Sequence, residues 1–122
     1  MQNIFLYANK DSSSLHRVEE YLRQIPLAVR FVILPPGTEF TSPASLNMRS
    51  NDLLVLFAED DSDIEQLITL RGEYESFRII LILERHNTLT SNRYINLSPR
   101  LVAYLESDLI GVSEYLTNIC LK

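Results

Sequence analysis

Residues 53–83 decide the fold, because two strand-length apolar runs lie on either side of a helical pattern. The runs are LLVLFA at Leu53–Ala58 and IILIL at Ile79–Leu83. Both are almost continuously apolar, which is typical of strands covered by helices on both faces of a sheet. Between them, Ser62 and Glu65 have the spacing of a capping box, which predicts that a helix starts there. Its apolar positions are Ile64, Leu67, Ile68 and Leu70.

Three further strand-length apolar runs flank this unit: Ile4–Ala8 (IFLYA), Val29–Leu34 (VRFVIL) and Leu101–Leu105 (LVAYL). The first is almost continuously apolar, so we expect it near the centre of the sheet with the two runs above. The second is interrupted by Arg30 and the third is milder, which predicts that both lie nearer the sheet edges.

Two more segments have the apolar spacing of amphipathic helices. One follows the first strand, can be capped by Asp11 or by the serines 12–14, and can end at Pro26. The other closes the chain and begins near Ser107 or Asp108. Their apolar positions are Leu15, Val18, Leu22 and Ile25 in the first, and Leu109, Val112, Leu116 and Ile119 in the second.

The connections 35–50 and 86–100 have weaker patterns. The first has room for a short helix at Pro43–Met48, and Ser91–Leu97 in the second can form a turn or two of helix before Pro99. Strands that alternate with helices favour parallel pairing through right-handed crossovers. The chain is therefore predicted to be one α/β domain over residues 1–122. Its expected fold is a doubly wound, flavodoxin-like three-layer sandwich with a five-stranded parallel sheet of order 2-1-3-4-5.

Composition excludes several classes of function. The formal net charge of -5 argues against direct nucleic-acid binding, because the 11 basic residues are scattered instead of clustered. A single cysteine, Cys120, offers no intramolecular disulfide and favours a reducing compartment. The start of the chain lacks the pattern of a signal peptide, and no apolar run approaches the roughly 20 residues that span a bilayer. These features predict a soluble, cytoplasmic protein.

Ligands of doubly wound sheets gather at the carboxyl ends of the strands, and that edge is acidic here. Asp11, Glu59, Asp60 and Asp61 are the candidate ligands for a hard cation such as Mg²⁺. The competing interpretation, which we favour, is that such residues cap helix N-termini. The turn NKDSSS after the first strand has no glycine-rich phosphate-binding pattern, although a helix N-terminus beside Ser12–Ser14 can hold a phosphate.

Candidates for nucleophilic or acid–base catalysis are weak. Cys120 falls on the apolar side of the last helix, and the sequence contains no GxSxG motif. His16 is predicted to lie inside the first helix, away from the carboxyl edge, and His86 is expected in an exposed loop. No catalytic residue and no cofactor are predicted.

The strand–helix order, with the segment RLVAYLESD followed by an amphipathic helix, resembles the receiver domains of response regulators. The resemblance implies a phosphorylation pocket at Ala8 and Asn9, at Phe57 or Ala58, at Glu84 and at Ser107. Active receivers carry acidic residues, a phosphoacceptor Asp, a Ser or Thr, and a Lys at these places, and this chain carries none of them there. Tyr104 matches the aromatic switch residue of receivers.

The resemblance therefore implies a noncatalytic, receiver-like interaction module in signalling or transcriptional regulation that is not phosphorylated in the usual way. Its partner would be another protein or a second copy of the chain. The expected surface comprises Tyr104 on the fifth strand, the connection 86–100 and the last helix. The alternative is a small enzyme that binds a metal or a phosphate ligand at the acidic carboxyl edge.

Overall fold

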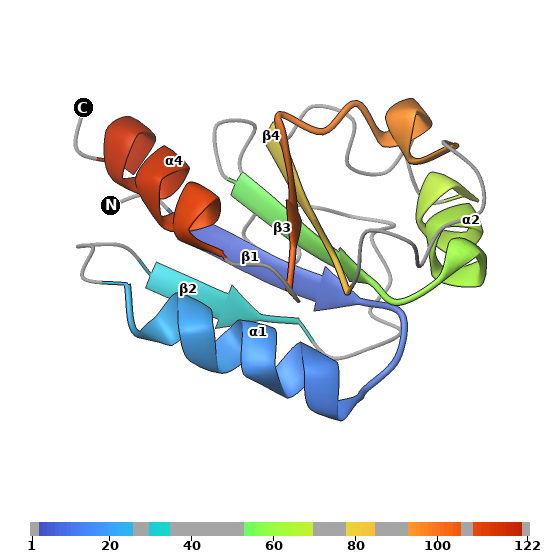
Figure 1. Ribbon diagram of the computed structural model, residues 1–122, viewed down its shortest axis with the longest axis horizontal. Coiled ribbons are helices and arrows are strands. Elements are labelled where there is room, and N and C mark those ends of the chain that lie inside the picture. The colour runs from blue at the N-terminus through green and yellow to red at the C-terminus, as the bar shows by residue number, and fades with distance from the viewer. Residues whose placement is uncertain are drawn as a thin grey trace.

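The computed structural model describes residues 3–25, 30–34, 53–69, 78–84, 93–105 and 109–120 of the chain. Within these residues, a helix follows every strand except the second in chain order, after which residues 35–52 are not described (Figure 1). The strands are β1 (Asn3–Ala8), β2 (Arg30–Ile33), β3 (Leu53–Ala58), β4 (Arg78–Leu83) and β5 (Leu101–Tyr104). The helices are α1 (Ser13–Arg23), α2 (Asp61–Thr69), α4 (Ile110–Cys120) and the short 3-10 helix η2 (Arg93–Leu97).

All five strands belong to one parallel sheet in the order β2-β1-β3-β4-β5. The predicted α/β fold and strand order are therefore confirmed. Every residue of β3 is buried, and β4 is buried from Ile79 to Leu83. On the edge strand β5 only Ala103 is buried, so the predicted division into central and edge strands is also confirmed.

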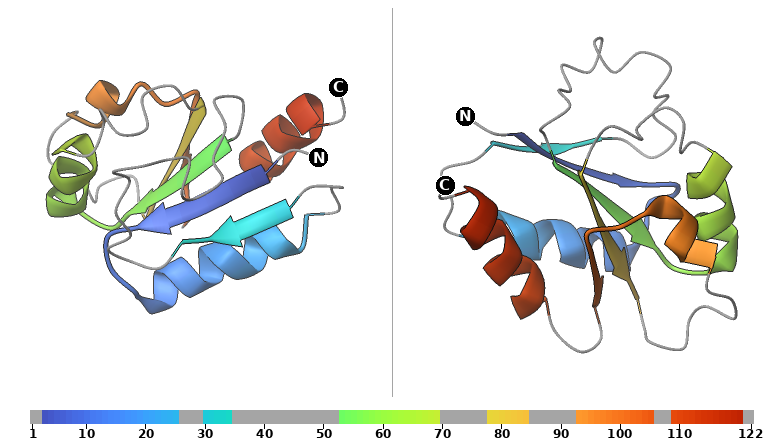
Figure 2. Two further views of the ribbon diagram at one scale, coloured as in Figure 1. Left: turned by 180° about the vertical axis from the view of Figure 1, so that it is seen from behind. Right: turned by 90° about the horizontal axis from the view of Figure 1, so that it is seen from above.

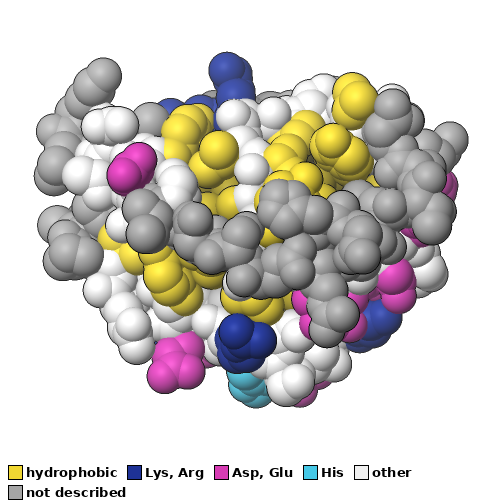
Figure 3. All heavy atoms as spheres, in the orientation of Figure 1, with side chains coloured by type: hydrophobic (Ala, Val, Ile, Leu, Met, Phe, Trp, Pro, Cys, Tyr) yellow, Lys and Arg dark blue, Asp and Glu magenta, His cyan; other side chains and the backbone are white. Residues whose placement is uncertain are grey.

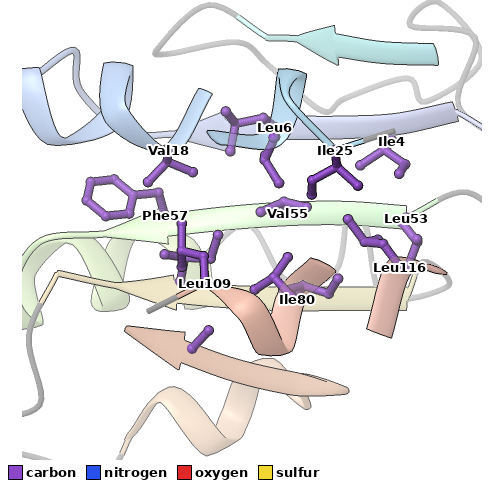
Figure 4. Packing of buried hydrophobic residues seen from close by; sticks show 14 of the residues in the cluster. Ile4, Leu6, Val18, Ile25, Leu53, Val55, Phe57, Ile80, Leu109 and Leu116 are labelled. Atoms are coloured by element: carbon purple, nitrogen blue, oxygen red, sulfur yellow. The ribbon is translucent and has the colours of Figure 1, made fainter. Parts of the chain in front are cut away.

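Helices cover both faces of the sheet, as Figure 2 shows from two sides. Side chains that alternate along each strand point to opposite faces, so the central strands supply two separate apolar layers. On one face, Val55, Phe57 and Ile80 pack with α1 and α4 (Figure 4). On the other face, Leu54 and Leu81 pack with α2 and with Leu97 of η2, among others. A strand that contributes side chains to both layers must therefore be apolar at every position.

The predicted apolar stripes face this core. Leu15, Val18, Leu22 and Ile25 are buried under the sheet, as are Leu109, Val112 and Leu116. Ser12 caps α1, since its side-chain oxygen accepts a hydrogen bond of 3.1 Å from the backbone N–H of Leu15. The expected turn of helix within 91–97 is present as η2.

Several predictions lie outside the described residues: the short helix at Pro43–Met48, the start of the last helix at Ser107 or Asp108, the helix end at Pro26, the apolar position Leu70, and His86. The side chains of Ile119 and Cys120 are likewise not described. Among the described helices, none is long and apolar enough to cross a membrane.

Candidate functional site

The carboxyl ends of β1, β3 and β4 meet at one edge of the sheet, because these neighbouring strands are parallel. Figure 1 shows the arrowheads of β1 and β3 ending close to the start of α2. Asn9 and Lys10 follow β1, Glu59 and Asp60 follow β3, and Glu84 follows β4. We call the polar residues after these strands the carboxyl edge.

Two aspartates stabilise the turn between β3 and α2, because each accepts a hydrogen bond from a backbone N–H there. Oδ1 of Asp60 accepts a hydrogen bond of 2.9 Å from the backbone N–H of Asp63. Oδ2 of Asp63 accepts one of 2.9 Å from the backbone N–H of Glu59. The carbonyl oxygen of Asp60 accepts the first helical bond, from Ile64, at 3.2 Å. Asp60 is therefore the N-cap of α2, and Asp63 reaches back in the manner of a capping box.

This arrangement corrects the predicted start of the helix. The capping box was expected at Ser62 and Glu65, but α2 begins at Asp61, and both of those side chains are exposed. The physical reason is that Asp60 stands directly after a buried strand, where the first free N–H groups of the helix need an acceptor. Capping thus starts two residues earlier than the serine suggested.

Lys10 brings a positive charge into this turn from the loop between β1 and α1. Its Nζ lies 3.4 Å from Oδ2 of Asp60, 3.7 Å from Oδ1 of Asp63 and 3.7 Å from Oε2 of Glu59. These charges raise the pKa of Lys10 above its ordinary value of 10.5. Asp63 has the largest effect, partial desolvation opposes it, and Asp60 and Glu59 add to it. The preceding residue, Asn9, donates a hydrogen bond of 2.9 Å from Nδ2 to the carbonyl oxygen of Asp63.

A second polar link joins β4 to α1. The hydroxyl of Ser14, which is buried, donates a hydrogen bond of 3.0 Å to Oε1 of Glu84. This bond holds the carboxylate of Glu84 beside the first turn of α1, where the helix dipole favours negative charge. Glu84 thus has a structural partner at the position where the receiver resemblance implied a Ser or Thr.

The side chains predicted as metal ligands do not all gather at one place. Glu59 and Asp60 come together around Lys10, whereas Asp11 is exposed and lies 2.7 Å from Nε2 of His16. His16 lies inside α1, as predicted. Asp61 is the first residue of α2. The described part of the chain contains no group of three His, Cys, Asp or Glu residues placed to hold a metal ion.

Three of the positions that the receiver resemblance assigned to the phosphorylation pocket are apolar and closed to solvent. Ala8, Phe57 and Ala58 are 3%, 1% and 0% exposed. Phe57 packs in the layer under α1 and α4, and Ala58 in the layer on the α2 side. Ser107 lies outside the described residues. Tyr104 is partly exposed on the edge strand β5 and packs against the α2-side layer.

Sequence reasoning missed the parts played by Lys10, Asp63 and Ser14 at this edge. For Asp63 a signal was present, because Asp60 and Asp63 have the same spacing as Ser62 and Glu65 and follow a strand directly. The contacts of Lys10 and Ser14 cross between loops 50 and 70 residues apart, so no local pattern announces them.

No protein-family model matches the chain, and no curated protein matches it. Among solved structures, it is similar to a crystal structure of a "putative pilus assembly-related protein" from Burkholderia pseudomallei. The TM-score is 0.62 at 14% sequence identity, and the match covers 99% of this chain and 90% of the other. At that identity the similarity shows the fold, which is an α/β protein with a flavodoxin-like parallel sheet.

Proposed function

We propose that the chain is a receiver-like protein-interaction module that works without phosphorylation of the usual kind. The observation that carries the proposal is the burial of the apolar residues at the phosphoacceptor position. Phe57 and Ala58 occupy the phosphoacceptor position inside the core, where a phosphoryl donor has no access. Two carboxylates that follow β3, those of Asp60 and Asp63, accept backbone hydrogen bonds at the start of α2 and contact Lys10. The carboxylates of this site therefore stabilise the fold and are poorly suited to group transfer.

The proposed interaction surface is the side of the molecule formed by β5, η2 and α4. Leu101, Val102, Tyr104 and Leu105 are only partly buried, and Ile95 of η2 is 59% exposed. Figure 3 shows hydrophobic side chains on the face where α4, β5 and η2 come toward the viewer. Partly exposed apolar and aromatic side chains on an edge strand suit a protein partner or a second copy of the chain. The similar fold of a protein described as related to pilus assembly fits this proposal, because assembly of a pilus is a process of protein association.

Partner binding can be tested with Tyr104→Ala, measured by concentration-dependent sedimentation and by capture of partner proteins. We expect loss of self-association or of capture, because the partner would lose an aromatic contact. Tyr21→Ala is the matched control, since Tyr21 is also partly buried but lies on α1, which packs beside the opposite edge strand β2. Both variants are checked for folding by circular dichroism. The proposal would be contradicted if the protein were a strict monomer and its folded Tyr104→Ala variant captured every partner normally.

The absence of phosphorylation is tested separately with acetyl phosphate and Mg²⁺, followed by intact mass measurement. We expect no addition of a phosphoryl group, while an active receiver treated in parallel is modified. The alternative of a metal-binding enzyme predicts a rise in melting temperature once Mg²⁺ exceeds its dissociation constant. Such a rise would favour the alternative, and a phosphorylated product would contradict the proposed lack of phosphorylation.

A further inference from the structure

Two consecutive residues of the loop after β1, Asn9 and Lys10, contact the segment that forms the start of α2. Asn9 binds the carbonyl oxygen of Asp63 across 54 positions of sequence. Lys10 places its ammonium near three carboxylates, those of Glu59 and Asp60 just before α2 and that of Asp63 in its first turn. The two loops are therefore joined by a neutral hydrogen bond and by a group of charge contacts.

Each aspartate in this turn divides its two oxygens between backbone and ammonium. Asp60 uses Oδ1 to cap the N–H of Asp63 and turns Oδ2 toward Lys10. Asp63 uses Oδ2 for the N–H of Glu59 and turns Oδ1 toward Lys10. Loss of the ammonium would leave three carboxylates facing one another without a cation, and their repulsion would act directly on the capping bonds.

We propose that Lys10 is an electrostatic clasp that holds the carboxyl edge closed. Its ammonium offsets the negative charge of the three carboxylates that it contacts. Opening of the first turn of α2 is then controlled by ionic strength and by the charge at residue 10, and it is independent of Mg²⁺. This inference goes beyond the proposed function, since it concerns how the edge opens and not what the protein binds.

The exposure of Lys10 and the burial of Asp63 suit a clasp whose strength depends on salt. The side chain of Lys10 is 50% exposed, so water and salt ions reach it. The side chain of Asp63 is 5% exposed, so its charge depends on partners within the protein. The strands beneath are held by apolar burial, which moderate salt does not screen. Salt should therefore loosen the edge before it affects the sheet.

The test is hydrogen exchange, resolved by NMR, at the backbone amides of Glu59 and Asp63, which donate to the two aspartates. Lys10→Met keeps most of the side-chain length and removes the charge, whereas Lys10→Arg keeps the charge. We expect roughly two- to fivefold faster exchange in Lys10→Met, as for loss of a partly exposed ion pair, and rates close to wild type in Lys10→Arg. Residue 10 is remote in sequence from both amides, so their intrinsic exchange chemistry is unchanged.

Two internal controls separate the clasp from general effects. Arg17→Met removes one positive charge from an exposed residue of α1 that forms no ion pair with any described residue, and it should leave both amides unchanged. The amide of Leu34, which donates to the carbonyl oxygen of Leu6 at 2.9 Å, reports on the sheet and should also be unchanged. Equal acceleration in Arg17→Met, or at Leu34, would overturn the clasp.

Salt provides the final arm. Sodium chloride near 1 M, where the screening length is about 3 Å, should bring wild-type exchange close to the Lys10→Met rate and change that variant little. Magnesium chloride at matched ionic strength should act like sodium chloride. Slower exchange in the wild type with Mg²⁺ than with the matched sodium salt, or a Lys10→Met rate equal to that of wild type, would overturn the proposal.

Discussion

The centre of the sheet and its carboxyl edge are held together by different forces. In the centre, β3 is buried along its whole length and packs into apolar layers on both faces. At the edge, Asn9, Lys10, Asp60 and Asp63 are joined by hydrogen bonds and charge contacts, and Lys10 remains half exposed. Burial in the centre is insensitive to pH and salt, whereas charge contacts near solvent respond to both. We therefore expect the centre to contribute most of the unfolding free energy, and the contacts at the edge to change in strength with pH and salt.

The largest expected effect comes from the centre. Phe57→Ala removes a ring that is 1% exposed under α1 and α4, which should cost about 3–5 kcal/mol of unfolding free energy through lost burial and the cavity left behind. Urea denaturation followed by circular dichroism measures this. Phe31→Ala on the edge strand β2 is the control and should cost less, because Phe31 is only partly buried. Equal losses would break the distinction between centre and periphery.

The next effect concerns the most buried acid of the edge. Asp63→Ala removes an acceptor of the Glu59 N–H and a partner of Lys10, and we expect a loss of about 2–3 kcal/mol. Ser62→Ala is the control in the same helical turn, and it should be nearly neutral because Ser62 is exposed. Thermal unfolding of both variants measures the difference. A larger loss in Ser62→Ala would restore the capping box expected at Ser62 and Glu65.

A smaller effect is expected at the cap of α1. Ser12→Ala removes the oxygen that accepts from the N–H of Leu15 and should cost about 1 kcal/mol. Ser13→Ala is the comparison, because Ser13 is exposed at the first helical position and should tolerate the change. Chemical denaturation of the two variants side by side gives the answer, and equal midpoints would assign the cap elsewhere.

The smallest effect is a dependence on alkaline pH. The folded chain raises the pKa of Lys10 above 10.5, chiefly through Asp63. The stability that its ion pairs contribute is fully present below the unfolded pKa, and it is lost as pH rises through the folded pKa. The difference in urea midpoint between wild type and Lys10→Met should therefore shrink from about pH 9 to about pH 12. A constant difference over that range would show that the charge of Lys10 is not its source.

The sequence by itself determined the sheet and its two layers. Runs such as Leu53–Ala58 and Ile79–Leu83 are apolar at every position, and at five or six residues they fit a strand covered on both faces better than a buried helix. The apolar spacing in α1 and α4 was equally explicit, because a helix must turn one stripe toward the core. The sequence also showed that Phe57 and Ala58, at the positions that the receiver resemblance assigns to the phosphoacceptor, carry no group that can accept a phosphoryl group.

Only the tertiary structure decided how the carboxyl edge is wired. The bonds from Ser14 to Glu84 and from Asn9 to Asp63 depend on which segments the sheet order brings together. Capping by Asp60 and the contact of Asp11 with His16 join residues only three and five positions apart, but the sequence offered rival caps and did not choose between them. The charge of Lys10 was visible in the sequence, but its partners lie about 50 positions away. Apolar periodicity is a local consequence of burial, whereas contacts between loops are set by the packing of the whole sheet. For that reason the fold was predictable from the residues in order, and the clasp at its edge was not.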